Sequence, residues 1–154
     1  MSAGLRDQIM QAMKDAMKSG DKLRLSTVRL MQSAIKDKDI ASRTDGRNDG
    51  VSDADILEVF TKMVKQRRES ADLYEKGGRA DLVAQERGEI AVIEEFMPKQ
   101  LGDAETKAAV EAVVVELGAT SVKDMGKVMA ALKTKYAGQM DFGKAGGVVK
   151  GLLG

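Results

Sequence analysis

The chain has 154 residues, of which 43% are hydrophobic and 32% are charged, with 25 basic and 24 acidic side chains. That length fits one ordinary domain or two small ones. Histidine and cysteine are absent, which excludes disulfides, thiolate metal sites and the side chains that titrate most readily near neutral pH.

Several classes of site and location can be judged from the same composition. Aromatic residues make up 3% of the chain with no Trp, which disfavours a base-stacking platform for single-stranded nucleic acid. No phosphate-binding loop or dinucleotide fingerprint is present, and DGRNDG (45–50) lacks the acid that closes a calcium loop. We therefore expect no cofactor, no metal and no catalytic residue. The N-terminal segment is interrupted by Arg6 and Asp7 and resembles neither a secretory signal nor a membrane span, which predicts a cytoplasmic protein without membrane association.

The first half of the N-terminal region predicts two helices. A first helix ends at Gly20, and its apolar positions at four-residue spacing are Leu5, Ile9, Met13 and Met17. Asp21 can cap a second helix that continues to about Arg43, with apolar positions at Leu23, Val28, Met31, Ile35 and Ile40. The segment TDGRNDG (44–50) contains turn-forming residues and no apolar residue, and it predicts a loop.

Two further helices are predicted before the single proline. Ser52 and Asp55 resemble a capping box at the start of a third helix, which ends after Lys76 at two glycines and buries Ile56, Val59, Phe60, Met63 and Val64. A fourth helix stops before Pro98 and carries Leu82, Val83, Ile90, Ile93 and Phe96. Gly88 lies inside this helix, where glycine costs about 1 kcal/mol relative to alanine.

The pattern changes after Pro98. Residues 1–98 hold 17 basic and 18 acidic side chains, whereas residues 99–154 hold eight lysines, no arginine and six acids. Short helices are predicted over 103–117, 121–136 and 142–153, with Asp103, Ser121 and Asp141 as their caps. The sequence therefore predicts an all-α fold, with an N-terminal helical domain over 1–98 and a small three-helix domain over 99–154. The boundary is expected in MPKQLG (97–102).

The segment DMGKVMAALKTKYAGQMD (124–141) has three lysines and no acid between Met125 and Met140. On a helical wheel, one face gathers Met125, Val128, Met129, Leu132 and Tyr136, and the opposite face gathers Lys123, Gly126, Lys127, Ala130 and Thr134. The uncharged residues of the second face are all small, so a phosphate backbone could approach it closely. If Gly126 instead lies at the helix start, free backbone amides beside Lys127 would add an anion site.

Two stretches of unbalanced charge extend this pattern. From Lys123 to Gly154 there are six lysines and two acids, and Lys144 and Lys150 of the last helix could join the same positive face. Alternatively, these lysines are simply the solvated side of amphipathic helices. A second basic stretch runs over 14–43 with eight bases and four acids, opposite an acidic stretch over 69–95 with eight acids and three bases. We expect these two stretches to pair mainly as interhelical salt bridges.

Four separated blocks carry a family resemblance. They are LRLSTVRLMQSAIKDKDI (23–40), KQRRESADLYEKGGRADL (65–82), EIAVIEEFMPKQL (89–101) and DMGKVMAALKTKYAGQMD (124–141). In this order, across essentially the whole chain, they resemble the YqeY family. The second half also resembles the tail domain of GatB, a component of the glutamine-dependent tRNA amidotransferase, and modules appended to some glutaminyl-tRNA synthetases.

The resemblance implies a helical bundle followed by a three-helix module that, in the related tail domains, contacts tRNA. The positions that match are Gly126 and Lys127, followed by Lys133 and Lys135. The family-level association is with glutamine-dependent carbon–nitrogen ligases. Such chemistry requires a Ser-Ser-Lys or Cys nucleophile and a nucleotide site, and this sequence shows neither.

Three functional hypotheses remain. The leading one is a tRNA-binding accessory protein that docks on the backbone of structured RNA and is linked to tRNA amidotransferase or aminoacylation; its contacts are Lys123, Gly126, Lys127, Lys133, Lys135, Lys144 and Lys150. The second is a protein-interaction module whose first domain packs into a dimer or onto an aminoacylation or amidotransferase complex, with Met10, Met31 or Met63 as adaptable contacts. The third is an enzyme component; its only candidate acids, Glu89, Glu94 and Glu95, are expected to form a solvated helix face.

Overall fold

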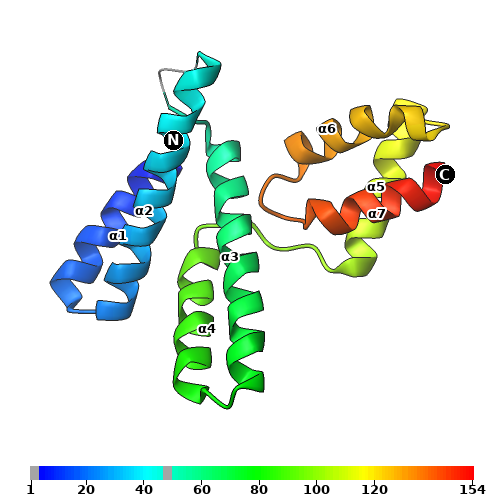
Figure 1. Cartoon of the computed structure of the whole chain (residues 1–154). Helices are drawn as coiled ribbons and strands as arrows, with labels where there is room; N and C mark the ends of the chain where they lie inside the picture. The colour runs from blue at the N-terminus through cyan, green and yellow to red at the C-terminus, as the bar shows by residue number, and fades with distance from the viewer. Residues whose placement is uncertain (1–3, 47–49) are drawn as a thin grey trace. The chain divides into compact units, whose positions relative to one another are not determined.

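The computed structural model describes residues 4–46 and 50–154. Over these residues the chain folds into seven α-helices and two short 3-10 helices with no strand, which confirms the predicted all-α class (Figure 1). The chain divides into two compact units, Met1–Pro98 and Lys99–Gly154. Of the loop predicted over 44–50, the structure shows the 3-10 helix η1 (Arg43–Asp45) and a turn at Gly46, while residues 47–49 lie outside the described part.

The first unit consists of two helical hairpins. The first pairs α1 (Leu5–Ser19) with α2 (Lys22–Ser42), and the second pairs α3 (Asp53–Lys76) with α4 (Ala80–Glu94) (Figure 1). One apolar core joins all four helices, and its fully buried residues include Ile9, Val28, Met31, Ile56, Phe60 and Ile93. Two predicted caps are confirmed: Asp21 accepts the Arg24 N–H, and Ser52 forms a capping box with Asp55.

Three apolar positions predicted inside α1 and α2 lie at the surface instead. Met17 is 55% exposed, Ile40 47% and Leu23 40%. A spacing of four residues advances about 40° beyond a full turn at each step, so the fourth member of the Leu5 stripe leaves the core. Ala12 and Ala16 are buried in its place. Of the methionines considered for partner contacts, Met31 and Met63 belong to the core and Met10 is exposed.

The glycine inside α4 has a packing reason. A Cβ at Gly88 would lie 2.7 Å from Cδ2 of Leu23 in α2. The two helices therefore approach closely at this point, and the hydrogen of glycine leaves room for the leucine side chain.

The second unit is a three-helix module of α5 (Asp103–Leu117), α6 (Met125–Lys135) and α7 (Phe142–Leu153), with the 3-10 helix η2 (Val122–Asp124) before α6. Its core contains Val110, Val113, Val128, Leu132, Ala145 and Val149. The predicted cap at Asp141 is confirmed, since its carboxylate accepts the Gly143 and Lys144 amides.

The other two predicted caps of this module are wrong. Asp103 is the first residue of α5, and Gly102 takes the capping position. The Ser121 side chain makes no capping bond, and the α-helix begins four residues later at Met125, because η2 occupies the intervening turn. Asp124 holds this turn by accepting the Thr120 N–H at 3.0 Å.

Candidate nucleic-acid interface

The outward side of η2 and α6 is a low, cationic surface. Lys123, Gly126, Lys127, Ala130 and Thr134 are all exposed, as the helical wheel predicted. Apart from its chain neighbours and the backbone of its own helix, no described heavy atom lies within 4 Å of where a Cβ of residue 126 would be, so this position faces open space. The surface therefore combines two ammonium groups with side chains too short to hold a ligand backbone away.

The opposite side of α6 positions this surface against the rest of the module. Val128 and Leu132 are fully buried in the core. The methyl ends of Met125 and Met129 lie near Gly146 of α7, at 3.8 and 3.9 Å from a Cβ built there. Because α6 is held along this whole side, its outward side is fixed relative to α7.

Lys133 and Lys150 lie on the flanks of α6 and α7 that face one another. Lys133 is four residues after Met129, and Lys150 is four residues after Gly146, so each lies one turn beyond a residue of the α6–α7 contact. Both lysines are exposed, and neither forms an ion pair within the described residues. They can therefore extend the cationic surface of α6 toward α7. We refer to Lys123, Gly126, Lys127, Lys133 and Lys150 as the α6 surface.

Lys135 and Lys144 lie apart from this surface, next to acids of α5. The ammonium of Lys135 is 3.9 Å from Glu116 and 5.8 Å from the ring centre of Tyr136. Lys144 is 3.9 Å from Asp103. At about 100° per residue, Lys135 lies about 80° from Lys127 and about 160° from Lys133 around α6. Two of the seven predicted contact residues, Lys135 and Lys144, are therefore paired with acids of α5, whereas Lys123, Lys127, Lys133 and Lys150 form no ion pair within the described residues.

The first backbone amide of α6 is already bonded within the preceding 3-10 turn. Gly126 is the second residue of the helix, but the amide before it, that of Met125, donates to the Val122 carbonyl of the 3-10 turn. The pKa of the Asp124 carboxyl is lowered, mainly by the Thr120 N–H, then by the Ser121 N–H, and least by the charge of Lys127. The lysine side chains supply the positive charges that would attract an anion to this site.

The three acids considered for catalysis each pair with an arginine. Glu89 is buried and accepts from Nε of Arg67 at 2.9 Å, and Glu94 accepts from Arg68 at 2.7 Å. Glu95 pairs with Arg24. The expectation of a solvated acidic face is wrong for Glu89, which is buried, whereas Glu94 and Glu95 stay 35% and 53% exposed while each pairs with an arginine.

Two features of the described residues bear on other functions. No group of three or more acids gathers in a way that could hold a metal ion there. Among the helices described, none has both the length and the apolar character that a membrane crossing requires.

Comparison with known proteins decides the family. The model of the YqeY family, described as Yqey-like protein, matches residues 6–153. The chain belongs to the YqeY family. The match includes both helical units, so the four sequence blocks that suggested this family lie within it.

Several relatives carry the name altered inheritance of mitochondria protein 41, mitochondrial. The protein from Eremothecium gossypii is 36% identical over 87 residues, which are 56% of this chain and 45% of that protein. The protein from Lachancea thermotolerans is 31% identical over 107 residues, or 68% and 55% of the two chains. The Saccharomyces cerevisiae S288c protein is 33% identical over 85 residues, or 55% and 44%. The chain therefore spans about half the length of these relatives.

The names of these relatives contradict one prediction. The sequence predicted a cytoplasmic protein, whereas the matched relatives are named as mitochondrial proteins. The prediction rested on the absence of a recognisable targeting segment, which is indirect evidence about location.

Proposed function

We propose that this YqeY protein is a tRNA-binding accessory protein whose α6 surface docks on the sugar–phosphate backbone of structured RNA. The observation that carries the proposal is the exposed pair Lys123 and Lys127 beside Gly126, on a helix side without bulky residues. Lysine ammonium groups bind phosphates as point charges, and short neighbours let the two backbones approach.

The composition of this surface favours folded RNA over single strands. Its exposed residues include no aromatic side chain on which bases could stack. Recognition through backbone charge is typical of proteins that read the shape of an RNA helix. Four phosphate contacts, one for each lysine of the α6 surface, would give a modest affinity that falls steeply with salt.

The proposal includes a link to glutamine-dependent tRNA amidotransferase or aminoacylation, supported by the resemblance of the second unit to the amidotransferase tail domain. The chain would act there without chemistry of its own, by holding tRNA or by joining the complex. A protein-interaction role without RNA is the competing hypothesis.

The test is tRNA binding by Lys127→Glu, measured by filter binding at low salt. We expect the affinity to fall about tenfold, because the variant removes one phosphate contact and adds a repulsive charge. Lys107→Glu is the matched control, since Lys107 is an exposed lysine of α5 in the same unit. Thermal unfolding followed by circular dichroism shows whether both variants stay folded. Equal affinity of Lys127→Glu and the parent chain would refute the proposal.

A further inference from the structure

A second line of cations runs along the outer side of α2. Lys22, Arg29, Lys36 and Arg43 follow one another at intervals of seven residues, and all four are exposed. Seven residues are nearly two turns of a helix, so successive members lie about 10 Å apart on one side, with a drift of about 20° per interval. Arg43 directly follows α2 and keeps helical backbone angles, so the line continues to it. We call these residues the α2 line.

The arginines of the first unit show that this line is unusual. Eight arginines are described, and six of them form ion pairs: Arg6, Arg24, Arg67, Arg68, Arg79 and Arg87. The two that do not are Arg29 and Arg43, and both belong to the α2 line. Most described arginines of this unit are thus paired with acids, and Arg29 and Arg43 form no ion pair among the described residues, although the charge of Arg43 contributes to lowering the pKa of Asp39.

The acidic stretch over 69–95 does not neutralise the α2 line. Only Arg24 of the basic stretch over 14–43 pairs with it, through Glu95. The other paired acids of the acidic stretch bind arginines of α3, α4 or the turn between these two helices. Our expectation that the two stretches pair mainly with each other is therefore wrong, because the α3–α4 hairpin carries its own arginines. Glu89, which borders a groove with Lys22 and Arg29, is already held by Arg67.

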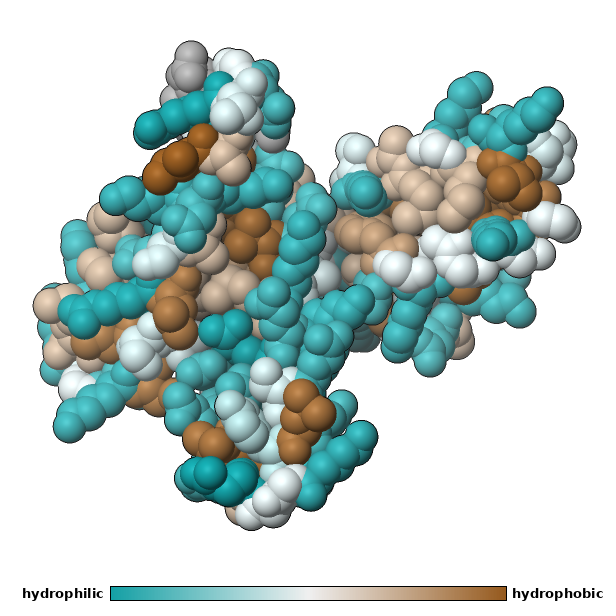
Figure 2. Space-filling view, in the orientation of Figure 1, coloured by the Kyte–Doolittle hydropathy of each residue, from teal (hydrophilic) through white to brown (hydrophobic). Residues whose placement is uncertain are grey.

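The rest of this helix side suits a phosphate backbone better than a partner helix. A docking helix needs apolar positions about every three to four residues. The exposed apolar residues of α2 are Leu23, Leu30 and Ile40, and the exposed residues between them are polar: Ser26, Ser33 and Asp37. The visible face of the first unit likewise shows apolar patches separated by hydrophilic residues (Figure 2). Ser33 is exposed and lies between Arg29 and Lys36 along the helix, and its hydroxyl could donate to a phosphate oxygen.

We infer that the α2 line is a second contact surface for the phosphate backbone of folded RNA. The inference rests on the proposed RNA-binding function and adds a site on the other unit of the chain. Two bound surfaces joined by one chain bind more tightly than either surface alone, so each can remain modest in charge.

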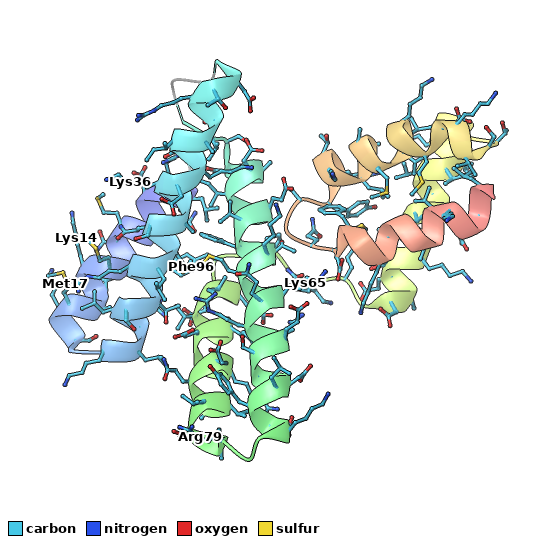
Figure 3. All side chains as sticks on the ribbon, viewed as in Figure 1. Lys14, Met17, Lys36, Lys65, Arg79 and Phe96 are labelled. Carbon is cyan, nitrogen blue, oxygen red and sulfur yellow. The ribbon has the colours of Figure 1, made fainter. Side chains whose placement is uncertain are left out.

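The test compares two doubly substituted chains. The first carries Arg29→Gln with Lys36→Gln and neutralises the middle of the α2 line. The second, the matched control, carries Lys62→Gln with Lys65→Gln and neutralises two exposed cations of α3 in the same unit. Lys36 and Lys65 are labelled in Figure 3. Glutamine keeps a high helix propensity at every position. The affinity for tRNA is measured over a series of salt concentrations. The logarithm of the binding constant falls as the logarithm of the salt concentration rises. We expect the α2 variant to make this negative slope smaller in magnitude by about 1.4 to 1.8, since each lost phosphate contact contributes about 0.7 to 0.9. The control should leave the slope unchanged.

The outcomes separate this inference from the proposed function. If Lys127→Glu weakens binding and the α2 variant keeps the parental slope, the α2 line is not a contact and only the inference fails. If the α2 variant lowers the slope and Lys127→Glu has no effect, the inference stands and the α6 surface fails. If the parent chain does not bind tRNA, both fail. A protein partner that survives nuclease treatment and is lost in the α2 variant, with the RNA slope unchanged, would assign the line to an acidic protein and overturn the inference.

Discussion

The ion pair between Arg67 of α3 and Glu89 of α4 gives the sharpest prediction about stability. Nε of Arg67 lies 2.9 Å from Oε2 of Glu89, and the two side chains are only 15% and 10% exposed. Arg67 also donates to the Met63 carbonyl, and Gln85 lies 3.4 Å from the other carboxylate oxygen. The pair therefore sits within a small polar network inside the α3–α4 hairpin.

The two charges can be removed one at a time or together. Arg67→Met leaves a largely buried carboxylate with only the distant Gln85 amide, which should cost about 3 kcal/mol, the low end for a broken buried pair. Glu89→Gln keeps an acceptor for Arg67 and should cost about 1.5–2 kcal/mol. Replacing both, with Arg67→Met and Glu89→Leu, removes both desolvation penalties and should stay within about 1 kcal/mol of the parent.

Native-state hydrogen exchange of the α3 and α4 amides is the appropriate assay, because a chain with two units need not unfold in one step. A loss of about 3 kcal/mol in Arg67→Met lowers the protection of the slowest amides about 100-fold. If the double variant loses as much protection as Arg67→Met, the cost comes from lost packing and the reasoning is wrong. A second readout is the neighbouring Glu86. Burial raises its pKa and the charge of Glu89 raises it further, so Glu89→Gln should lower it in an NMR titration.

Two other predictions concern the joints between helices. Asp39 accepts from both terminal nitrogens of Arg6, at 2.7 and 3.0 Å, and from the Val51 amide at 2.9 Å. The pKa of Asp39 is lowered, mainly by the hydrogen bond from Arg6. The ionised Asp39 therefore stabilises the fold fully above the ordinary pKa of an aspartate, near 4, and this stabilisation is lost as pH falls through the lower pKa of the folded state. Asp39→Asn should cost about 1–2 kcal/mol at neutral pH and remove this acid-dependent loss, as measured by urea unfolding across pH. Gly88→Ala gains about 1 kcal/mol of helix propensity but displaces the Leu23 side chain, so this single variant should have nearly the stability of the parent. In a chain that already carries Leu23→Ala, Gly88→Ala should raise the free energy of unfolding by about 1 kcal/mol, measured by the same urea unfolding. A large loss in that background would show that the backbones themselves collide.

The sequence predicted the helices well because each signal was local. Apolar periodicity, the Ser52–Asp55 box and the cap at Asp141 depend on residues within a few positions of one another. The short 3-10 turn before α6 was not predicted, because Ser121 is a plausible cap by type and the bond from Thr120 to Asp124 decides the actual start.

Interactions between helices were harder to predict. The Arg6–Asp39 pair joins residues 33 positions apart and also fixes Val51, and no local pattern marks it. The ion pairs of Glu89, Glu94 and Glu95 were not predicted for the same reason, since the arginines that hold these carboxylates lie on other helices. The regular interval of the α2 line was visible in the sequence, but its significance depends on knowing which arginines remain unpaired after folding.

The distinction between paired and unpaired cations also ranks the residues of the candidate interface. A lysine without a partner can move to a phosphate at little cost, whereas Lys135 would first have to leave Glu116, and Lys144 would have to leave Asp103. These pairs are exposed and long, so they are individually weak, but they direct both ammonium groups toward α5. The net charge of the chain, only +1, therefore says little about RNA binding. For the proposed function, what matters is that cations without an ion pair among the described residues share particular helix sides. Lys123 and Lys127 lie on the outward side of α6, and Arg29 and Lys36 lie on that of α2, where a phosphate backbone would meet two of them at once.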